Sequence, residues 1–577
     1  MWKSGTRRHG AQQRQGGEDM KANDNVGRLC LPVDSDLRAV MQVIEAGQER
    51  ICFLVESDGR LVMTVTDGDV RRALLAGKIL SDPARDIHSR HPVTVPHGRD
   101  QQDSIRLLSK RIAVVPVVDA AGRVTDILRF HDAAPLSNVK SLDVAIIGMG
   151  YVGLTLGVVM ADSGFSVIGY DRNPDLIAAL DRLESPFFER GLDLMIHAHV
   201  GHSLQVTANP DDLQADIYIV CVGTPIDKTT KKPDTSGLEA SIRTVGTRLK
   251  KDDFVILRST VPFGYTRERV IPLLEETSGL RCGDGFKIAF CPERTIEGKA
   301  LEELRRLPQI VGGFDTQSRE LALRLFYENT HTVIDVGSIE AAELCKLLDN
   351  TYRDTIFAFS NQMARFAEGV GLDLHDLIRK VNLGYSRNAI PLPSPGVGGS
   401  CLSKDPYILA DAFERRGLDA TLLKDARAEN ELWPAHIRDR CQALLRRLGK
   451  DMAEATVFIM GFAFKGEPET SDLRESTTLW LLDHLRSCGV ANIRGYDPVV
   501  GATELAALGI ETMPPEQGFA GADIVLLMNN HRSFTHLAVL DLLNRMNKPS
   551  VFFDAWHMFD RSEIERVPGI TYAGVGS

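Results

Sequence analysis

The sequence predicts an α/β protein with two doubly wound parallel-sheet domains, joined by a long central helix and preceded by a pair of smaller α/β units. Two observations predict the sheets: short apolar strands alternate with helical segments over residues 141–336, and the same alternation returns over residues 433–577. A third observation predicts the smaller units, because residues 29–136 contain a strand, turn, strand and helix pattern twice.

Composition places the chain among ordinary globular proteins with several domains. It has 577 residues, of which 25% are charged and 43% hydrophobic, and its formal net charge is −11. Scattered basic residues argue against nucleic-acid binding, and no apolar run approaches the length of a membrane span. The nine cysteines contain no C-x-x-C pair and fit neither a disulfide framework nor a zinc site. We therefore expect a cytoplasmic protein without a bound metal.

The N-terminal region combines a tail and a repeat. Residues 1–28 are polar, lack the apolar core of a signal peptide, and are expected to form a disordered tail. In the first copy of the repeat, two strands flank a turn at residues 58–60, and a helix is expected from Val70 to Leu75. The second copy repeats this pattern over residues 113–128.

The repeat resembles a pair of CBS domains, and Thr66-Asp67-Gly68-Asp69-Val70-Arg71-Arg72 carries the resemblance. CBS pairs commonly bind adenine nucleotides through the Thr and Asp of the strand-to-helix turn. The resemblance therefore implies that Thr66 and Asp69 bind a regulatory nucleotide. The second copy departs from the pattern, because Leu128-Arg129-Phe130-His131-Asp132 occupies its turn. A pair that serves only in dimerisation stays an open alternative.

A glycine-rich turn after residues 143–147 marks a dinucleotide site. It reads Gly148-Met149-Gly150-Tyr151-Val152-Gly153, between an expected strand and helix, and Asp171 ends the next strand about twenty residues on. This context is that of the Rossmann fingerprint. The glycines place a pyrophosphate at the helix N-terminus, and Asp171 would bind the ribose. Because a carboxylate repels a 2′-phosphate, NAD is favoured over NADP, although Arg172 weakens this argument.

Three further strands are expected to end at the same edge, where ligands of open α/β sheets bind. The first is followed by Val222 and Thr224, and the second by Thr260. The third is followed by Glu293, which becomes a candidate acid or base.

The stretch Pro395-Gly396-Val397-Gly398-Gly399-Ser400-Cys401-Leu402-Ser403-Lys404-Asp405-Pro406 is typical of a reactive thiol. Three glycines before Cys401 let the backbone approach a ligand, and Lys404 and Asp405 follow within one helical turn. From these residues alone the cysteine is as much a bystander as a nucleophile, because cysteine motifs do not transfer between families.

A long helix is expected from an N-cap at Ser338 to about Glu368. Lys346 and Asn350 are four residues apart and share one face of it. A solvated Lys and Asn would be the ordinary outcome. Because their neighbours are mostly apolar, we interpret the two as donors that hold one oxyanion.

The motifs between residues 141 and 577 resemble those of the UDP-glucose/GDP-mannose dehydrogenase family. Besides the glycine turn and Lys346 with Asn350, they are Val222-Gly223-Thr224-Pro225, Ser259-Thr260-Val261-Pro262, Cys291-Pro292-Glu293-Arg294, Gly398-Gly399-Ser400-Cys401 with Lys404-Asp405, and Gly461-Phe462-Ala463-Phe464-Lys465 with Asp472-Leu473-Arg474-Glu475-Ser476. The resemblance implies a Rossmann-like NAD domain (residues 141–336), a central helical dimerisation domain (337–432) and a Rossmann-like UDP-sugar domain (433–577).

The resemblance implies a four-electron oxidation of the C6 hydroxyl of a nucleotide sugar with two NAD. Cys401 would attack the intermediate aldehyde, and the resulting thiohemiacetal would become a thioester that water hydrolyses. Lys346 and Asn350 would stabilise the oxyanion, Asp405 would handle protons through water, and Glu293 would be the base for hydrolysis.

The resemblance also implies binding roles. The cofactor contacts would be Gly148, Gly150, Tyr151, Val152, Gly153, Asp171, Val222, Thr224, Thr260, Lys404 and Arg474. The substrate contacts would be Glu293, Arg294, Arg387, Gly398 and Lys465. In relatives the arginine at the position of Arg387 reaches the substrate of the neighbouring subunit, which implies a homodimer or a higher homo-oligomer. The segment 466–471 between Lys465 and Arg474 departs from the usual spacing of the family by about two extra residues.

The motifs conflict about the sugar. Cys291-Pro292-Glu293-Arg294 and Asp405-Pro406-Tyr407 resemble the branch that acts on UDP-N-acetylhexosamines, whereas Gly399-Ser400-Cys401 and Lys404-Asp405 resemble the UDP-glucose and GDP-mannose branches. We favour UDP-N-acetylmannosamine or UDP-N-acetylglucosamine, used for polysaccharide synthesis, with UDP-glucose as the alternative. Two other classes stay open: a two-electron β-hydroxyacid dehydrogenase, which would not need the thiol, and a non-catalytic adenine-nucleotide sensor.

Overall fold

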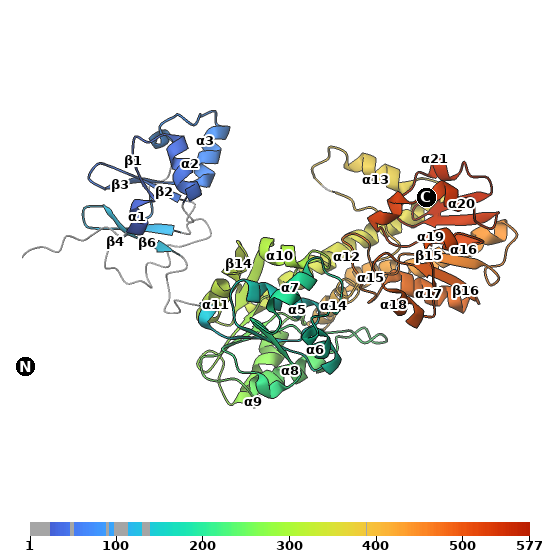
Figure 1. Ribbon diagram of the computed structural model, residues 1–577, viewed down its shortest axis with the longest axis horizontal. Helices are drawn as coiled ribbons and strands as arrows, with labels where there is room; N and C mark the ends of the chain where they lie inside the picture. The colour runs from blue at the N-terminus through green and yellow to red at the C-terminus, as the bar shows by residue number, and fades with distance from the viewer. Residues whose placement is uncertain (1–23, 47–50, 88–91, 97–113, 130–138, 388) are drawn as a thin grey trace, which may run out of the picture. The chain divides into compact units, whose positions relative to one another are not determined.

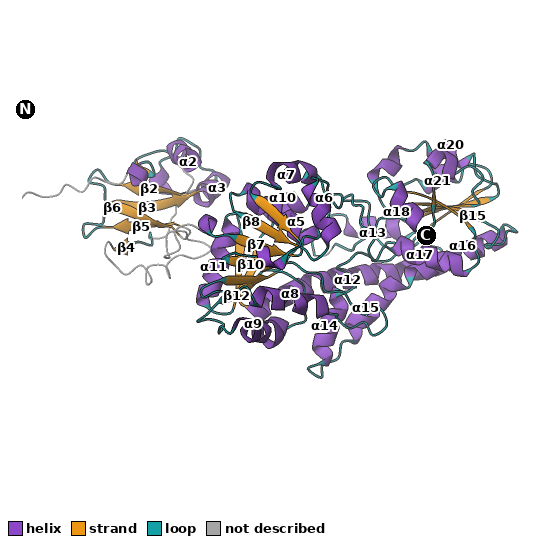
Figure 2. Cartoon of the chain, turned by 60° about the horizontal axis from the view of Figure 1, so that its bottom comes forward, coloured by secondary structure: helices purple, strands orange, loops and turns teal. Residues whose placement is uncertain are grey.

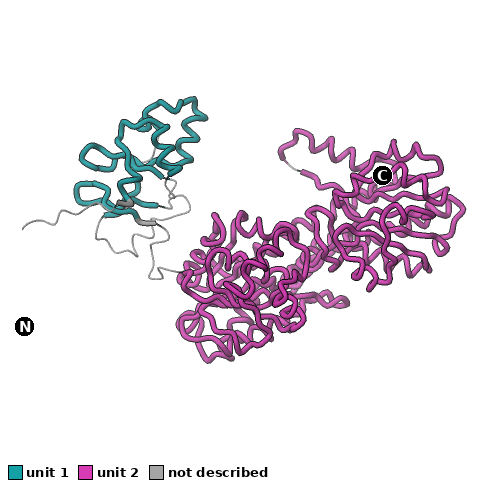
Figure 3. The backbone as a smooth tube through the Cα atoms, in the orientation of Figure 1, with its two compact units in different colours: residues 1–137 teal, residues 138–577 magenta. Residues whose placement is uncertain are grey.

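The computed structural model describes residues 24–46, 51–87, 92–96, 114–129, 139–387 and 389–577. The chain divides into two compact units, residues 1–137 and 138–577, which we describe separately (Figure 3). Within the described ranges, no helix combines the length and the apolar character that a membrane crossing requires.

The described part of the first unit contains two small three-stranded sheets of the same topology. In each sheet a parallel pair is followed by an antiparallel hairpin, with the strand orders β1-β2-β3 and β4-β5-β6. The two hairpin turns pair with each other, since Leu61 N donates to the Gly122 carbonyl at 3.0 Å and Val124 N donates to the Gly59 carbonyl at 3.3 Å. The repeated strand, turn and strand are therefore confirmed, whereas the residues after the last strand of the second copy, where its helix is expected, lie outside the described residues. Its elements are β1 (Cys30–Pro32), β2 (Ile51–Val55), β3 (Leu61–Thr66), β4 (Val95–Pro96), β5 (Val114–Val118), β6 (Val124–Arg129), α1 (Asp24–Gly27), α2 (Leu37–Ala46), α3 (Asp67–Leu75) and η1 (Ala84–Asp86).

Two boundaries in this unit differ from the predictions. The tail was expected to extend to Arg28, but α1 occupies Asp24–Gly27 and Val26 is buried, so the folded segment begins earlier. Helix α3 begins at Asp67 rather than Val70, because a capping box starts it directly after β3.

The second unit begins with an eight-stranded sheet (Figure 1). Its order is β14-β13-β12-β11-β10-β7-β8-β9, and the strands from β7 to β12 are parallel. These six follow the order 3-2-1-4-5-6 of a dinucleotide-binding sheet. The remaining two differ from the expected parallel sheet, because β13 runs antiparallel to β12 and β14 runs parallel to β13. Strands β7, β10 and β11 are buried along their whole length, as apolar strands are when helices cover both faces.

The elements of this domain are the following. The strands are β7 (Val144–Ile147), β8 (Val167–Tyr170), β9 (Leu204–Thr207), β10 (Ile217–Val220), β11 (Phe254–Leu257), β12 (Lys287–Phe290), β13 (Gln309–Gly313) and β14 (Val333–Ser338). The helices are η3 (Val139–Ser141), α5 (Tyr151–Asp162), α6 (Pro174–Asp181), α7 (Leu192–His199), η4 (Pro210–Asp212), α8 (Ser236–Gly246), η5 (Thr266–Val270), α9 (Ile271–Ser278), α10 (Ala300–Arg306) and α11 (Thr316–Tyr327).

Helix α12 (Ile339–Val370) runs from the first sheet domain to the second (Figure 1). It begins after Ser338, whose Oγ accepts from Ala341 N at 3.2 Å, and it ends at Gly371, which has a φ of +70°. The predicted central helix is therefore confirmed. Figure 2 shows α15 beside it; the shorter central helices are α13 (Leu374–Asn382), α14 (Asp405–Glu414) and α15 (Thr421–Glu431).

The second sheet confirms the second predicted α/β domain. Its six strands are all parallel, in the order β17-β16-β15-β18-β19-β20, which is again 3-2-1-4-5-6. The strands are β15 (Thr456–Met460), β16 (Asn492–Tyr496), β17 (Glu511–Thr512), β18 (Ile524–Leu527), β19 (Ser550–Asp554) and β20 (Ile570–Gly574). The helices are α16 (Trp433–Arg447), α17 (Thr477–Ser487), α18 (Ala502–Ala507), α19 (Pro515–Gly518), η6 (Arg532–His536), α20 (Val539–Leu543) and α21 (Arg561–Ile564).

Two stacked histidines join α13 to the end of this domain. The ring centroids of His375 and His557 are 3.8 Å apart, and His557 Nε2 lies 2.9 Å from the Val575 carbonyl oxygen. Burial, together with the neighbouring His557, lowers the pKa of His375 from 6.5 to about 3. The folded protein therefore keeps His375 neutral well into the acid range.

Because His375 stays neutral in the folded protein, we expect the free energy of unfolding to fall in acid. As the pH falls from 6.5 towards 3, the unfolded chain gains a proton at His375 that the folded protein does not, so the free energy of unfolding falls. The slope from this group is at most about 1.4 kcal/mol per pH unit. His375→Phe keeps a stacked ring without the titration, and urea unfolding across this range should show a shallower acid loss. Equal slopes in the two proteins would contradict the prediction.

Candidate active site

The glycine turn after β7 is shaped for a close ligand. Gly148 has a φ of +94°, and a Cβ on Gly153 would lie 1.8 Å from the Gly148 carbonyl oxygen. Helix α5 begins after Gly150, which has open space where a Cβ would stand and no side-chain cap. The first N–H groups of α5, from Tyr151 and Val152 onward, are therefore free for an anion. This cradle fits the pyrophosphate of NAD.

Asp171 follows β8 and supports this turn. Its Oδ2 accepts from Met149 N at 2.8 Å, and its Oδ1 accepts from Asn173 N at 2.9 Å. The side chain is half-buried, and each carboxylate oxygen has a second lone pair that can accept from a ribose hydroxyl. The position thus fits the predicted ribose contact.

The ends of β10 and β11 lie together at the same edge. Thr224 Oγ1 donates to the Thr260 carbonyl at 2.5 Å, and a Cβ on Gly148 would lie 3.2 Å from Val222 Cγ2. The structure therefore brings the predicted strand-end residues next to the glycine turn.

Lys346 and Asn350 are buried on one face of α12, with 8% and 2% exposure. Lys346 Nζ donates to the Glu293 carbonyl at 2.5 Å, and Asn350 Nδ2 donates to Asp405 Oδ2 at 2.5 Å. Asp405, the fully buried first residue of α14, also accepts from Lys404 Nζ at 2.6 Å. Lys346 with Glu293, and Asn350 with Asp405 and Lys404, thus form two hydrogen-bonded sets that start from one face of α12.

Cys401 lies in the turn before α14. All nine cysteines lie in the described residues, and Cys401 is the one whose residue is exposed. Its carbonyl accepts from Asp405 N at 3.0 Å, and its Sγ lies 3.9 Å from Ser400 Oγ. The thiol is therefore open to a substrate while its backbone is attached to the residue that contacts Asn350.

The glycines before Cys401 pack tightly against the second sheet domain. A Cβ on Gly398 would lie 2.3 Å from the Glu475 carbonyl oxygen, and a Cβ on Gly399 would lie 2.7 Å from the ring of Phe464. Gly399 N also donates to the Glu475 carbonyl at 3.1 Å. Only glycine fits these two positions, which explains the spacing of the motif.

Glu293 is buried and forms an ion pair with Arg258. Its Oε1 accepts from Arg294 N at 2.7 Å and from Thr295 N at 2.6 Å. Burial opposes ionisation, but the charge of Arg258 and these hydrogen bonds outweigh it and hold the pKa of Glu293 below its usual value. Such a carboxylate stays ionised, binds the neighbouring donors and is a weak proton acceptor. Its role as a base stays a prediction.

Two predicted substrate arginines have other contacts. Arg294 forms an ion pair with Asp349 at 2.8 Å on the outer side of α12. Arg387 is exposed after α13, and its guanidinium carbon lies 4.8 Å from the ring centroid of Tyr385. An exposed Arg387 is compatible with the predicted contact to a neighbouring subunit.

A second cluster joins the loop after β15 to the first sheet domain. Lys465 Nζ donates to the Glu297 carbonyl at 2.6 Å, while Arg474 pairs with Asp472 at 2.7 Å and with Glu297 at 3.2 Å. Burial, aided by Asp472, raises the pKa of Glu297, and burial lowers the pKa of Lys465. Glu297 was not among the site residues predicted from the sequence. The one feature of the sequence that could have indicated it is its position four residues after Glu293.

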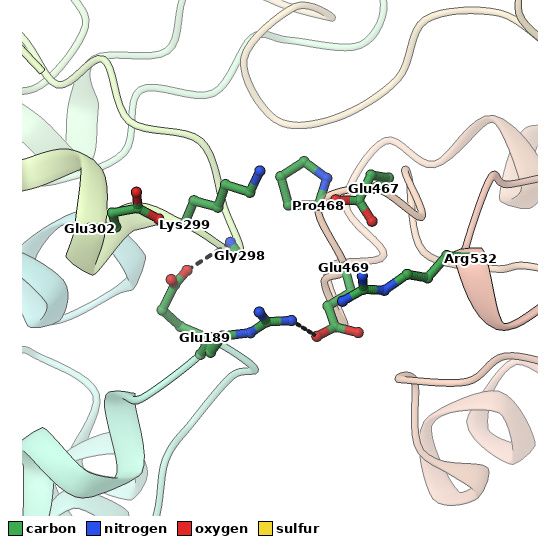
Figure 4. Close-up of a pocket in the computed structure, with 9 residues that line it drawn as sticks. Glu189, Gly298, Lys299, Glu302, Glu467, Pro468, Glu469 and Arg532 are labelled. Carbon is green, nitrogen blue, oxygen red and sulfur yellow. Dashed lines mark hydrogen bonds and ion pairs between the residues drawn. The ribbon is translucent and has the colours of Figure 1, made fainter. Parts of the chain in front are cut away.

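A pocket of about 250 Å³ lies beside this cluster (Figure 4). Among its lining residues, Arg190 and Glu469 form an ion pair at 2.9 Å, and Glu189 accepts from Gly298 N at 2.7 Å. Glu189 also accepts from the Tyr151 hydroxyl, which connects the pocket wall to the glycine turn. The residues that line the pocket come from both sheet domains. They are Glu189, Arg190, Gly298, Lys299, Glu302, Glu467, Pro468, Glu469 and Arg532.

In the first unit, Thr66 and Asp69 bind each other. Asp69 Oδ2 accepts from Thr66 N at 2.9 Å and from Thr66 Oγ1 at 2.6 Å, and Arg72 pairs with Asp69 at 2.6 Å. Burial opposes ionisation, but these bonds hold the pKa of Asp69 below its usual value. The two side chains therefore start α3, and nucleotide binding by them stays a prediction. In the second copy, residues 130–132 of the predicted turn lie outside the described residues.

Three family domains match the second unit in chain order. Residues 142–331 match the NAD binding domain of the UDP-glucose/GDP-mannose dehydrogenase family, residues 340–432 its central domain and residues 458–561 its UDP binding domain. Residues 84–134 match a CBS domain. That match covers the second copy of the repeat, whereas the motif that suggested the resemblance, residues 66–72, lies in the first.

Whole proteins match over the same region. A UDP-N-acetyl-D-mannosamine dehydrogenase of Pyrococcus horikoshii is 32% identical over 424 residues, which are 71% of this chain and 97% of the relative. An NDP-N-acetyl-D-galactosaminuronic acid dehydrogenase of Ralstonia nicotianae is 30% identical over 410 residues, 70% of this chain and 94% of the relative. The solved structure of the UDP-D-ManNAc dehydrogenase from Pyrococcus horikoshii aligns with a TM-score of 0.68 at 30% identity, covering 75% of this chain and 99% of that one.

Proposed function

Because the chain belongs to the UDP-glucose/GDP-mannose dehydrogenase family, we propose that it oxidises the C6 hydroxyl of a UDP-N-acetylhexosamine to a carboxylate in two successive oxidations. The protein is an NAD-dependent nucleotide-sugar dehydrogenase; the sugar and the number of electrons are the proposal. The observation that carries it is the exposed thiol of Cys401, fixed beside the buried group of Lys346, Asn350 and Asp405. A two-electron dehydrogenase has no use for such a thiol.

The glycine turn and Asp171 would hold NAD, which when bound would supply the hydride acceptor for each oxidation at C6. Once the aldehyde has formed, Sγ of Cys401 attacks its carbon, a C–S bond forms, and the carbonyl oxygen becomes the oxyanion of a thiohemiacetal. Lys346 Nζ and Asn350 Nδ2 are buried donors on the same face of α12 and stabilise this oxyanion. The second oxidation at the same carbon leaves a thioester on Cys401.

Hydrolysis completes the reaction. Water adds to the thioester carbon, the C–S bond breaks, and the carboxylate leaves while Cys401 returns as a thiolate. Glu293 orients this water from its ion pair with Arg258, and Asp405, bridged to Asn350 and Lys404, receives protons through water. In sum, one alcohol, one water and two NAD give one carboxylate, two NADH and three protons.

The proposed sugar is UDP-N-acetylmannosamine or UDP-N-acetylglucosamine, and the proposed use of the product is polysaccharide synthesis. Support comes from the two relatives above, whose names specify UDP-N-acetyl-D-mannosamine and NDP-N-acetyl-D-galactosaminuronic acid, and from Arg294 directly after Glu293. UDP-glucose is the alternative, because the residues around Cys401 resemble that branch.

A homodimer is part of the proposal. Large apolar side chains on one face of α12 are exposed in the single chain, namely Leu344, Leu348, Tyr352, Phe359 and Phe366. Such a stripe marks an interaction surface. The exposed Arg387 is the residue that we propose to contact the second copy.

The test is the amount of NADH formed per mole of sugar nucleotide consumed. UDP-N-acetylmannosamine, UDP-N-acetylglucosamine, UDP-glucose and GDP-mannose are compared, and we expect a ratio of two with one of the first two. A ratio of one with every sugar would contradict the thioester route. A ratio of two with UDP-glucose alone would keep that route and overturn the proposed sugar.

A further inference from the structure

Arg427 on α15 holds both sides of the turn that carries Cys401. Its Nη2 donates to the Val397 carbonyl at 2.7 Å, and its Nη1 donates to the Leu402 carbonyl at 3.0 Å. These two carbonyls bracket Gly398, Gly399 and Cys401. The guanidinium is fully buried, so water does not compete for the same carbonyls.

The same guanidinium is anchored to the helix that carries the proposed oxyanion donors. Arg427 Nη1 donates to Asp354 Oδ1 at 2.6 Å, and Asp354 is fully buried on α12. Lys346, Asn350 and Asp354 follow one another at intervals of four residues, which places them along one face of that helix. Arg427 therefore ties the thiol-bearing turn to the face that presents Lys346 and Asn350.

Amides complete the anchor. Asn430, one turn after Arg427 on α15, donates to Asp354 Oδ1 at 2.8 Å and accepts from Asn361 Nδ2 at 2.8 Å. Asn361 Oδ1 in turn accepts from Ser394 N at 2.9 Å, at the start of the same loop. The loop is thus hydrogen-bonded to α12 or α15 at three points, namely Ser394, Val397 and Leu402. Among these contacts, Arg427 is the only charged donor.

We propose that Arg427 is a positioning residue that sets the distance between the Cys401 thiol and the oxyanion site of Lys346 and Asn350. This inference rests on the proposed function. Its physical basis is the planar, forked geometry of arginine, which can hold a carboxylate and two carbonyls at fixed directions, whereas the single ammonium of lysine cannot. A misplaced thiol would slow its attack on the aldehyde, while the first oxidation, which does not use the thiol, would continue.

The test variant is Arg427→Lys, which keeps a positive charge beside Asp354. We expect NADH per sugar to fall from two towards one, and the C6 aldehyde to be released and captured by a hydrazide reagent. The rate of acid formation should fall about 10²-fold, as a displacement near 1 Å can cause. The KM for NAD should stay unchanged, because Arg427 does not contact the glycine turn that receives it.

Two further variants separate positioning from folding. Arg365→Lys weakens an ion pair between the same two helices, in which Arg365 contacts Glu429 at 2.5 and 3.0 Å, and leaves the cysteine turn untouched. It should lower the thermal midpoint without releasing aldehyde. The double variant Asp354→Asn with Arg427→Gln leaves no unpaired buried charge, so it should fold even if the single variant does not, and it should release aldehyde.

The outcomes distinguish this inference from the proposed function. A wild-type ratio of two, with Arg427→Lys and the double variant also giving two at unchanged rates, would overturn the positioning role alone. Aldehyde release by Arg365→Lys to the same extent would also overturn the positioning role of Arg427. Any weakening of the contact between α12 and α15 would then be enough to release aldehyde. A wild-type ratio of one would instead overturn the thioester route on which the inference rests.

Discussion

Replacing Cys401 with serine is expected to reduce acid formation by about 10³-fold or more while leaving the first oxidation measurable. A serine hydroxyl is far less ionised than a thiol at neutral pH and is a poor nucleophile without an adjacent base. Sγ of Cys401 is the exposed nucleophile in the fixed turn before α14, and the first hydride transfer does not use it. The variant should therefore stop at the aldehyde stage.

The measurement is NADH per sugar together with aldehyde captured by a hydrazide reagent. Cys488→Ser is the matched control, because Cys488 lies at the end of α17, where its Sγ contacts Arg438 at 3.5 Å, away from the predicted site residues. The control should keep a ratio of two. Unchanged acid formation by Cys401→Ser would end the thioester mechanism.

Lys346→Met is expected to lower kcat by about 10²–10³-fold, the cost of removing one preorganised oxyanion donor. Methionine has nearly the same length and keeps the site filled, but it offers no charge and no N–H to the oxygen at C6. Lys346 is 8% exposed, so water cannot easily replace its ammonium. Because the oxyanion forms after binding, the loss should fall on kcat more than on the KM for NAD.

Steady-state kinetics over both substrates measures this split, with thermal midpoints to confirm folding. Lys380→Met is the control, since Lys380 is exposed on α13 and pairs only with Asp376 among its described ionic partners. It should change kcat by less than about twofold, as expected of an exposed pair. An equal effect of the two substitutions would show that the loss comes from the general charge of the protein.

Most of the fold follows from local patterns in the sequence. Ser338 predicts the start of α12 because it can accept from the N–H three residues on, and the glycine turn predicts its own strand and helix. The antiparallel edge at β13 and β14 has no such signal. Short buried strands look alike in either direction, since periodicity does not encode the direction of pairing.

Site residues could be predicted together from the sequence where they lie on the same helix or strand. Lys346 and Asn350 share a face through the period of the helix alone. The ion pair between Glu293 and Arg258 joins two strand ends, so only the packed sheet reveals that Glu293 is an ionised anchor. Burial is the main cause of the raised pKa of Glu297, and Asp472 from the other sheet domain raises it further, so only the packed domains reveal the shift.

The paired hairpin turns of the first unit determine where the chain can be shortened. Leu61 and Val124 each donate a backbone hydrogen bond to the other copy, and Phe53 and Val114 belong to one shared apolar cluster. A fragment that retained a single copy would expose an unpaired sheet edge together with this apolar surface, which invites aggregation. Shortened proteins made for crystallisation should therefore lose both copies together and begin at residue 138, where the second unit starts.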